Sequence, residues 1–290
     1  MNRREAMLTI AAGTLGIAAG GKPSSPMIVR RGLPIIGLGT WQTFDVGPSD
    51  AARAPLRDVL TEFVALGGRV VDSSPMYGRS ESVLGDLAVE TGTRAKLFVA
   101  TKVWTSGRAA GIAQMEDSER KLRGKVDLMQ VHNLVDADTH LETLRAWKKS
   151  GRIRFLGITH YTASAYRDLE RELAKGGIDF VQLNYSLAER EAERRLLPFA
   201  ADHNVAVLVN RPFGGGSLFR DARSKPLPAF AAELGATSWA ELFLRWVVSH
   251  PAVTCAIPGT SKVEHLRQNM RAGRGEMMDA AMRGKMAVTV

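Results

Sequence analysis

Eight short apolar runs recur at a nearly constant interval along the chain, and they constrain its fold more than any other feature. The runs occupy residues 35–38, 69–72, 97–102, 126–132, 154–159, 180–184, 205–209 and 253–257. Each run is short and almost continuously apolar, which is typical of parallel strands that are buried on both faces. Their spacing of about 30 residues, with one longer gap before the last run, matches that of a strand followed by a helix.

The segments between these runs carry a helical repeat of apolar residues. In residues 55–66, Leu56, Val59 and Phe63 share one stripe, and Gly67 follows as a helix-ending signal. Similar stripes occur over residues 82–90, 140–149, 166–175 and 238–248. Eight alternating strands and helices predict an α/β fold, a single-domain (β/α)₈ TIM barrel, with an open doubly wound sheet as the alternative. The even spacing favours the barrel.

The first 26 residues differ from the rest and are interpreted as a leader. Arg3 and Arg4 precede a weakly apolar stretch over residues 7–19, which is too short to span a membrane that needs about 20 residues. This pattern resembles a twin-arginine signal, which the export machinery reads as an address. We therefore expect a signal peptide over residues 1–26, a barrel domain over residues 27–290 and a location in the periplasm. The alternative is an N-terminal helix or tail on a cytoplasmic protein, and no later stretch is apolar enough to span a membrane.

The charge balance is basic, but its distribution argues against a nucleic-acid partner. The chain has 39 Lys and Arg against 30 Asp and Glu, a formal net charge of +9. Its basic residues are spread along the chain and interleaved with acids, whereas nucleic-acid binders cluster them. The single cysteine, Cys255, lies in an apolar run, which predicts a buried thiol.

Four polar residues lie where predicted strands end, and in a barrel this rim holds the active site. Asp72 ends the second run, Tyr77 follows it, Lys102 ends the third and His132 ends the fourth. Singly, each could be a turn, packing or solvated residue. Together they suit proton transfer, because an ammonium lowers the pKa of a phenol, a carboxylate keeps a buried ammonium charged, and a histidine can hold a carbonyl oxygen. The set contains no nucleophile.

The string Asp-x-x-x-x-Tyr-Gly-x-Ser-Glu over residues 72–81, followed by the strand-end Lys102 and His132, resembles the aldo/keto reductase family. The likeness extends over residues 37–41, 149–157 and 257–261. It implies a catalytic tetrad and hydride transfer from NADPH, with NADH as the alternative cofactor, to an aldehyde or ketone while Tyr77 protonates the oxygen. The alternative is an NADP(H)-binding regulatory or partner-binding subunit on the same barrel, since a fold does not dictate its function. The oligomeric state is not predicted.

The same resemblance implies where the cofactor and substrate bind. The cofactor-binding residues that it implies lie in or after predicted strands, and they are Thr40, Trp41, Thr159, His160, Gln182, Asn210, Arg211, Pro212, Phe213, Gly214, Ser217, Gly259, Thr260, Ser261, Lys262, His265, Gln268 and Asn269. Trp41 and Trp104 are expected as walls of the substrate pocket, with core packing as the alternative.

This chain departs from the family pattern around the nicotinamide. Thr159-His160 stands where the family often has Ser-Asn, which implies a remodelled carboxamide site. Asn210 stands where many members place an aromatic ring against the nicotinamide, so this chain has no ring at that position to stack on the nicotinamide.

A further departure concerns the adenosine phosphate. Gly259 and His265 replace a lysine and an arginine that many members carry, and Lys262 and Arg267 could contact the 2′-phosphate instead. We therefore favour NADPH over NADH.

A metal hydrolase is the remaining alternative, built from His132, Asp136, Asp138 and His140. These residues lack a known ligand spacing, and the charge of Lys102 would oppose a cation. We therefore predict no metal site.

Overall fold

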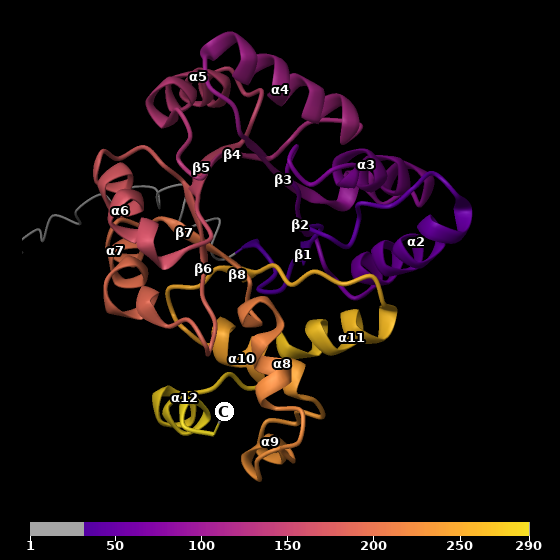
Figure 1. The fold of residues 1–290 in the computed structure, drawn as a ribbon, viewed down its shortest axis with the longest axis vertical. Helices are drawn as coiled ribbons and strands as arrows, with labels where there is room; N and C mark the ends of the chain where they lie inside the picture. The colour runs from indigo at the N-terminus through magenta and orange to yellow at the C-terminus, as the bar shows by residue number, and fades with distance from the viewer. Residues whose placement is uncertain (1–31, 290) are drawn as a thin grey trace, which may run out of the picture.

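The protein is described by a computed structural model over residues 32–289, and the proposed leader, residues 1–26, lies outside this range. Figure 1 shows strands ringed by helices, and each strand pairs in parallel with the next, from β1 to β8. The TIM barrel is therefore confirmed. The strands are β1 (Leu38–Gly39), β2 (Val70–Asp72), β3 (Phe98–Val103), β4 (Leu128–His132), β5 (Phe155–Thr159), β6 (Phe180–Asn184), β7 (Ala206–Asn210) and β8 (Cys255–Ala256).

The barrel closes between its two shortest strands. Gly37 N donates to Ala256 O at 2.8 Å, and Gly39 N donates to Pro258 O at 3.0 Å. β1 and β8 are both shorter than the apolar runs predicted. Pro258 has no N–H to continue the hydrogen-bond ladder, so few bonds join β1 and β8. A Cβ on Gly39 would lie 2.7 Å from Ile257 O, so a glycine is needed where the two strands approach.

The helices that cover the barrel include all five that were predicted. The helices are α2 (Asp50–Ala65), α3 (Ser80–Glu90), α4 (Arg108–Lys121), α5 (Ala137–Lys149), α6 (Tyr166–Ala174), α7 (Leu196–Asp202), α8 (Ser217–Asp221), α9 (Phe230–Glu233), α10 (Trp239–Val248), α11 (Val263–Ala272) and α12 (Ala280–Ala287). Short 3₁₀ turns are η1 (Arg94–Lys96), η2 (Ala163–Ala165), η3 (Glu191–Arg194) and η4 (Gly214–Gly216). The sequence pattern missed α4 because that helix buries only Gly111, Met115 and Ser118, too few apolar residues to produce a stripe.

Two apolar layers support the site. One fills the space between strands and helices, and the other fills the barrel interior with side chains such as Phe98, Leu128 and Phe180. Successive inward positions along a strand are two residues apart, so the next inward residues on β4 and β6 are polar, whereas β3 has the apolar Ala100 there and Lys102 one step further. Gln130 and Gln182 occupy two of these positions, next to the catalytic rim, and both are buried. Within residues 32–289, no helix is both long and apolar enough to cross a membrane.

Candidate active site

A buried ion pair joins the ends of β2 and β3. Lys102 Nζ lies 2.6 Å from Asp72 Oδ2 and donates a second hydrogen bond to Ser73 O at 2.7 Å. The Lys102 side chain is fully buried and that of Asp72 is nearly so. Burial alone lowers the pKa of Lys102, but Asp72 and Tyr77 outweigh it and raise this pKa above its usual value. The lysine therefore carries its charge inside the barrel, as the sequence predicted.

Tyr77 lies against this charge, in the loop between β2 and α3. Lys102 Nζ is 4.9 Å from the centroid of the Tyr77 ring. Burial is the largest influence and raises the pKa of Tyr77, while Lys102 lowers it and Asp72 raises it. The net direction is upward, so the predicted lowering of this pKa is wrong for the protein alone: lost hydration outweighs the ammonium. Tyr77 is therefore a protonated phenol at neutral pH, the form that a general acid requires.

His132 ends β4 and is 5% exposed. Burial, then the charge of Lys102 and then His160 lower the pKa of His132 to about 3. Its Nδ1 is buried without a hydrogen-bond partner among the described residues. A neutral imidazole carries one N–H, so His132 can donate a hydrogen bond to an oxygen without bringing a positive charge.

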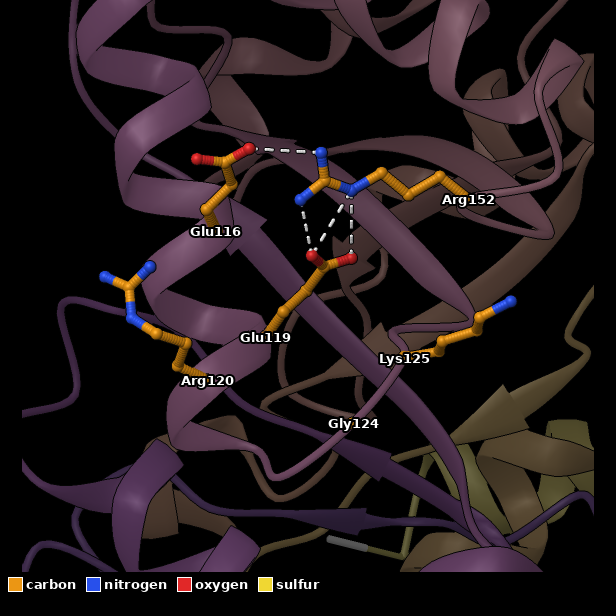
Figure 2. A pocket seen from close by; sticks show the side chains of 6 residues that line it. All are labelled: Glu116, Glu119, Arg120, Gly124, Lys125 and Arg152. Carbon is orange, nitrogen blue, oxygen red and sulfur yellow. Dashed lines mark hydrogen bonds and ion pairs between the residues drawn. The ribbon is translucent and has the colours of Figure 1, made fainter.

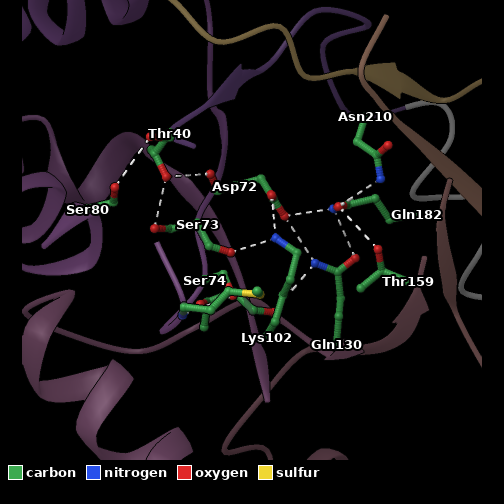
Figure 3. Close-up of polar contacts among 12 residues, drawn as sticks. Thr40, Asp72, Ser73, Ser74, Ser80, Lys102, Gln130, Thr159, Gln182 and Asn210 are labelled. Atoms are coloured by element: carbon green, nitrogen blue, oxygen red, sulfur yellow. Dashed lines mark hydrogen bonds and ion pairs between the residues drawn. The ribbon is translucent and has the colours of Figure 1, made fainter. Parts of the chain in front are cut away.

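Two glutamines hold the other side of the Asp72 carboxylate (Figure 3). Asp72 Oδ1 accepts from Gln182 Nε2 at 2.8 Å and from Gln130 Nε2 at 3.1 Å. Gln182 Oε1 in turn accepts from Thr159 Oγ1 at 3.3 Å and Asn210 Nδ2 at 3.4 Å. Gln182, expected at the cofactor, thus already has protein partners for its amide. Gln130 was not predicted, although a polar residue at an inward position of a buried strand is a signal that could have found it.

The residues expected near the nicotinamide lie after β1 and β5. Thr40 is buried, and its hydroxyl donates to Asp72 O at 3.0 Å and Ser73 Oγ at 2.9 Å, so its side chain braces β2. Thr159 is buried against Gln182, as described above. His160 Nδ1 accepts from Tyr161 N at 3.0 Å, which leaves any N–H of a neutral His160 ring on Nε2.

The loop after β7 holds the residues expected over the pyrophosphate, Asn210, Arg211, Pro212, Phe213, Gly214 and Ser217. Asn210 Nδ2 also donates to His160 O at 3.2 Å, while Asn210 Oδ1 and Arg211 Nε are buried without partners among the described residues. Gly214, like the two glycines after it, has a positive φ, and a Cβ there would lie 2.6 Å from Ser217 Oγ. A loop with unpaired buried polar atoms beside a glycine run fits a polar ligand.

The segment expected at the adenosine joins β8 to α11. Its expected residues are Gly259, Thr260, Ser261, Lys262, His265, Gln268 and Asn269. Lys262, just before α11, and His265, in its first turn, are exposed, whereas Asn269 is buried. Arg267 Nε lies 2.7 Å from Glu62 Oε1, so this alternative phosphate ligand is already in an ion pair.

The two tryptophans expected at the substrate pocket are exposed rather than packed in the core. Trp41 is 53% exposed and Trp104 is 43% exposed. The backbone of Trp104 is held by the side chain of Gln114, which accepts from Trp104 N at 2.6 Å and donates to Trp104 O at 3.2 Å. A large apolar ring presented to solvent on a fixed backbone is typical of a binding surface.

The residues of the metal-hydrolase alternative are engaged elsewhere. Asp136 accepts from Gly107 N at 2.7 Å, His140 Nε2 contacts Thr105 O at 2.7 Å, and Asp138 pairs with Lys175 at 2.9 Å. Across residues 32–289, no three His, Cys, Asp or Glu side chains gather as a metal site would require.

A surface hollow of about 490 Å³ lies away from the tetrad, beside α4 (Figure 2). Its lining residues are Glu116, Glu119, Arg120, Gly124, Lys125 and Arg152. The Arg152 guanidinium pairs with Glu116 Oε1 at 3.1 Å and with Glu119 Oε2 at 2.6 Å, and it lies over the ring of Trp147. Because residues 124 and 152 precede β4 and β5, this hollow lies toward the amino ends of the strands. The catalytic rim is at their carboxyl ends.

Comparisons with known proteins point to one family. The family model described as "Aldo/keto reductase family" matches residues 35–283. A methylglyoxal reductase of Escherichia coli, YeaE, is 28% identical over 259 residues, which cover 86% of this chain and 89% of that protein. An uncharacterized oxidoreductase of Mycobacterium tuberculosis is 29% identical and covers 83% of this chain and 85% of its own. A crystal structure of an aldo/keto reductase from Klebsiella pneumoniae, in complex with NADP and acetate, superposes with a TM-score of 0.75 at 27% identity, covering 88% of this chain and 90% of that chain.

Proposed function

Because the chain belongs to the aldo/keto reductase family, we propose that it reduces aldehyde or ketone carbonyls with NADPH. One observation carries this function: a charged, fully buried lysine lies against the ring of a protonated tyrosine, beside a neutral histidine. The three groups meet at the carboxyl ends of the strands, where barrel enzymes hold their substrates.

Each residue of the tetrad has a distinct task. His132 donates a hydrogen bond that orients the carbonyl oxygen toward Tyr77, and Tyr77 gives its phenolic proton to that oxygen as negative charge develops on it. Lys102 stabilises the phenolate that remains, because its ammonium stays charged beside Asp72. NADPH, when bound, supplies the hydride that reaches the carbonyl carbon.

The described residues fit such a cofactor. Asn210 Oδ1 is buried, has no hydrogen-bond partner within residues 32–289 and is oriented by two bonds from its own Nδ2, so it can accept an N–H of the carboxamide. Arg211 and the glycine turn after it would contact the pyrophosphate, and the exposed Lys262 and His265 would contact the adenosine phosphate. The Klebsiella pneumoniae relative with NADP bound supports this choice of cofactor.

The central test compares purified wild-type protein with Y77F. The wild type should oxidise NADPH in the presence of a reactive aldehyde, and Y77F should lose turnover while its dissociation constant for NADPH stays the same. Y161F removes a hydroxyl from an exposed tyrosine near the rim and serves as the matched control. Full turnover by Y77F would refute the mechanism. A carbonyl panel run with NADPH and NADH side by side then ranks substrates and cofactors.

We also propose that residues 1–26 direct this enzyme to the periplasm by a twin-arginine route. The proposal rests on Arg3 and Arg4 and on the short apolar stretch that follows them. A reporter fused after residue 26 should reach the periplasm, and its delivery should fail when both arginines are changed to lysine. Delivery that survives R3K/R4K would end the twin-arginine route, and retention of the unaltered fusion in the cytoplasm would end the periplasmic assignment.

A further inference from the structure

Gln130 is a buried polar residue that the tetrad does not include. It lies on β4, two residues before His132, and is fully buried. The residue two positions earlier on the same strand, Leu128, belongs to the apolar barrel interior. A buried amide costs free energy unless its donors and acceptor are all satisfied, so a glutamine here needs a reason that an apolar residue would not.

The local packing makes room for this side chain. On the neighbouring strand β5, Gly157 pairs in register with Gln130. A Cβ on Gly157 would lie 3.1 Å from Gln130 Cγ, tighter than ordinary van der Waals contact. The glycine therefore allows the glutamine to lie across the barrel interior toward β2.

The contacts of Gln130 converge on one carboxylate oxygen. Its Nε2 donates to Asp72 Oδ1 at 3.1 Å and to Thr101 O at 3.5 Å, and its Oε1 accepts from Gln182 Nε2 at 3.3 Å. Gln182 donates to the same Asp72 Oδ1 at 2.8 Å (Figure 3). Both glutamines thus hold one oxygen of Asp72, while the other oxygen faces the ammonium of Lys102.

This division of the carboxylate matters for the phenol. The amides are neutral, so they disperse the negative charge of Asp72 without cancelling the positive charge of Lys102. Without them only Lys102 would hold the carboxylate, and its full negative charge would oppose the effect of Lys102 on Tyr77. Consistent with this, after the dominant effect of burial, Lys102 lowers the pKa of Tyr77 and Asp72 raises it.

We propose that Gln130 is a positioning residue: it fixes the Asp72 carboxylate so that the charge of Lys102 acts on Tyr77. Its part in the reaction rests on the proposed function, but its effect on the phenol exists in the protein without cofactor. The two can therefore be tested separately.

Other titratable groups around the pair are His132 on β4, His160 after β5, Glu81 on α3 and Cys255 on β8. Burial lowers the pKa of both histidines and raises that of the thiol. Burial likewise raises the pKa of Glu81, whose carboxylate accepts from Thr101 and Ser118 rather than from the tetrad. A substitution at position 130 replaces none of these side chains.

The test replaces Gln130 by methionine, which keeps the length of the side chain and removes its donor. L128M is the matched control, because it introduces the same residue two positions away on the same strand, in the apolar part of the interior. The protein is made with difluorotyrosine, whose more acidic phenol titrates nearer to neutrality, and each of the 4 tyrosines is followed by fluorine NMR against pH. The Y77F spectrum assigns the resonance of Tyr77.

We expect Q130M to raise the titration midpoint of Tyr77 by about half a unit to one unit, because the phenolate loses net positive potential. L128M should leave it unchanged. In the enzyme with cofactor, kcat should fall and its pH profile should move in the same direction, while the dissociation constant for NADPH stays constant. If Q130M does not fold, Q130L serves the same purpose.

A midpoint that is the same in Q130M and wild type overturns the proposal, and so does an equal shift in L128M. If the protein shows no turnover with any carbonyl but the midpoint still moves, the proposed function fails while the positioning role stands.

Discussion

Substitution of His132 by asparagine should make the protein less sensitive to acid. The imidazole is 5% exposed, and burial, with the charge of Lys102, lowers the pKa of His132 from its usual 6.5 to about 3. The unfolded chain therefore binds a proton near pH 6.5 that the folded protein does not take up until about pH 3. Stability must fall as the pH drops through this window, because the unfolded state binds more protons there.

The size of this effect follows from the two pKa values. At pH 8 the imidazole is neutral in both states and contributes nothing. At pH 5 the unfolded state is favoured by about 2 kcal/mol, and at pH 4 by about 3 kcal/mol, through this one group. Asparagine does not titrate, so the free energy of unfolding of H132N should fall less than that of wild type between pH 8 and pH 5, by about 2 kcal/mol.

Urea denaturation at pH 8 and pH 5 measures this difference, since all other titrating groups are common to both proteins and cancel. The starting stability of H132N is irrelevant, because only the change with pH is compared. H203N, which removes an exposed histidine, controls for the loss of an imidazole as such. If wild type and H132N lose the same free energy between the two pH values, the neutral, buried state of His132 is wrong, and with it the assignment of a neutral hydrogen-bond donor.

Three further predictions concern packing, reactivity and specificity. G85A places a Cβ 2.1 Å from Lys121 O and should destabilise the protein by about 1–3 kcal/mol in urea denaturation. G284A, on the open face of α12, should stabilise it by up to about 1 kcal/mol. Equal effects of the two substitutions would show that the α3–α4 contact is not tight. Burial raises the pKa of the Cys255 thiol, so a thiol reagent should modify the protein only after unfolding, and rapid labelling of the native protein would contradict this. W104A should raise KM for an aromatic aldehyde by about tenfold. V89A, which shortens another exposed apolar side chain, should leave KM unchanged. If W104A and wild type have the same KM, Trp104 does not line the substrate pocket.

Much of the fold and the tetrad could be predicted from local pattern. The apolar runs identified all eight strands, because strands buried on both faces have no polar alternation to obscure them. Asp72, Lys102 and His132 could be grouped because parallel strands in a barrel end at one rim. Helix α4 could not be found this way, since its buried face contains mostly small or polar residues.

The protonation states and hydrogen-bond partners of the site residues were less predictable. The sequence supplied an ammonium for Tyr77 and so predicted a lowered pKa, but burial outweighs that charge and raises it. Gln182 and Thr40 were expected at the cofactor, and the sequence did not predict that both also bond to the β2 segment. Gln130 was absent from the predicted site: its place in a buried strand marks it as an inward polar residue, but the linear pattern does not show that the Asp72 carboxylate lies within reach of its amide.

The sequence by itself therefore determined the barrel, the rim and the residue types that face it, because strand periodicity and chain order dictate which side chains share an end. Only the tertiary structure decided which hydrogen bonds those side chains make, how far each is removed from water and, in consequence, where their protons reside. The hydrogen bonds, the burial and the protonation states depend on distances across the barrel interior. One example is the 2.8 Å between Gln182 Nε2 and Asp72 Oδ1, which belong to residues far apart in the chain.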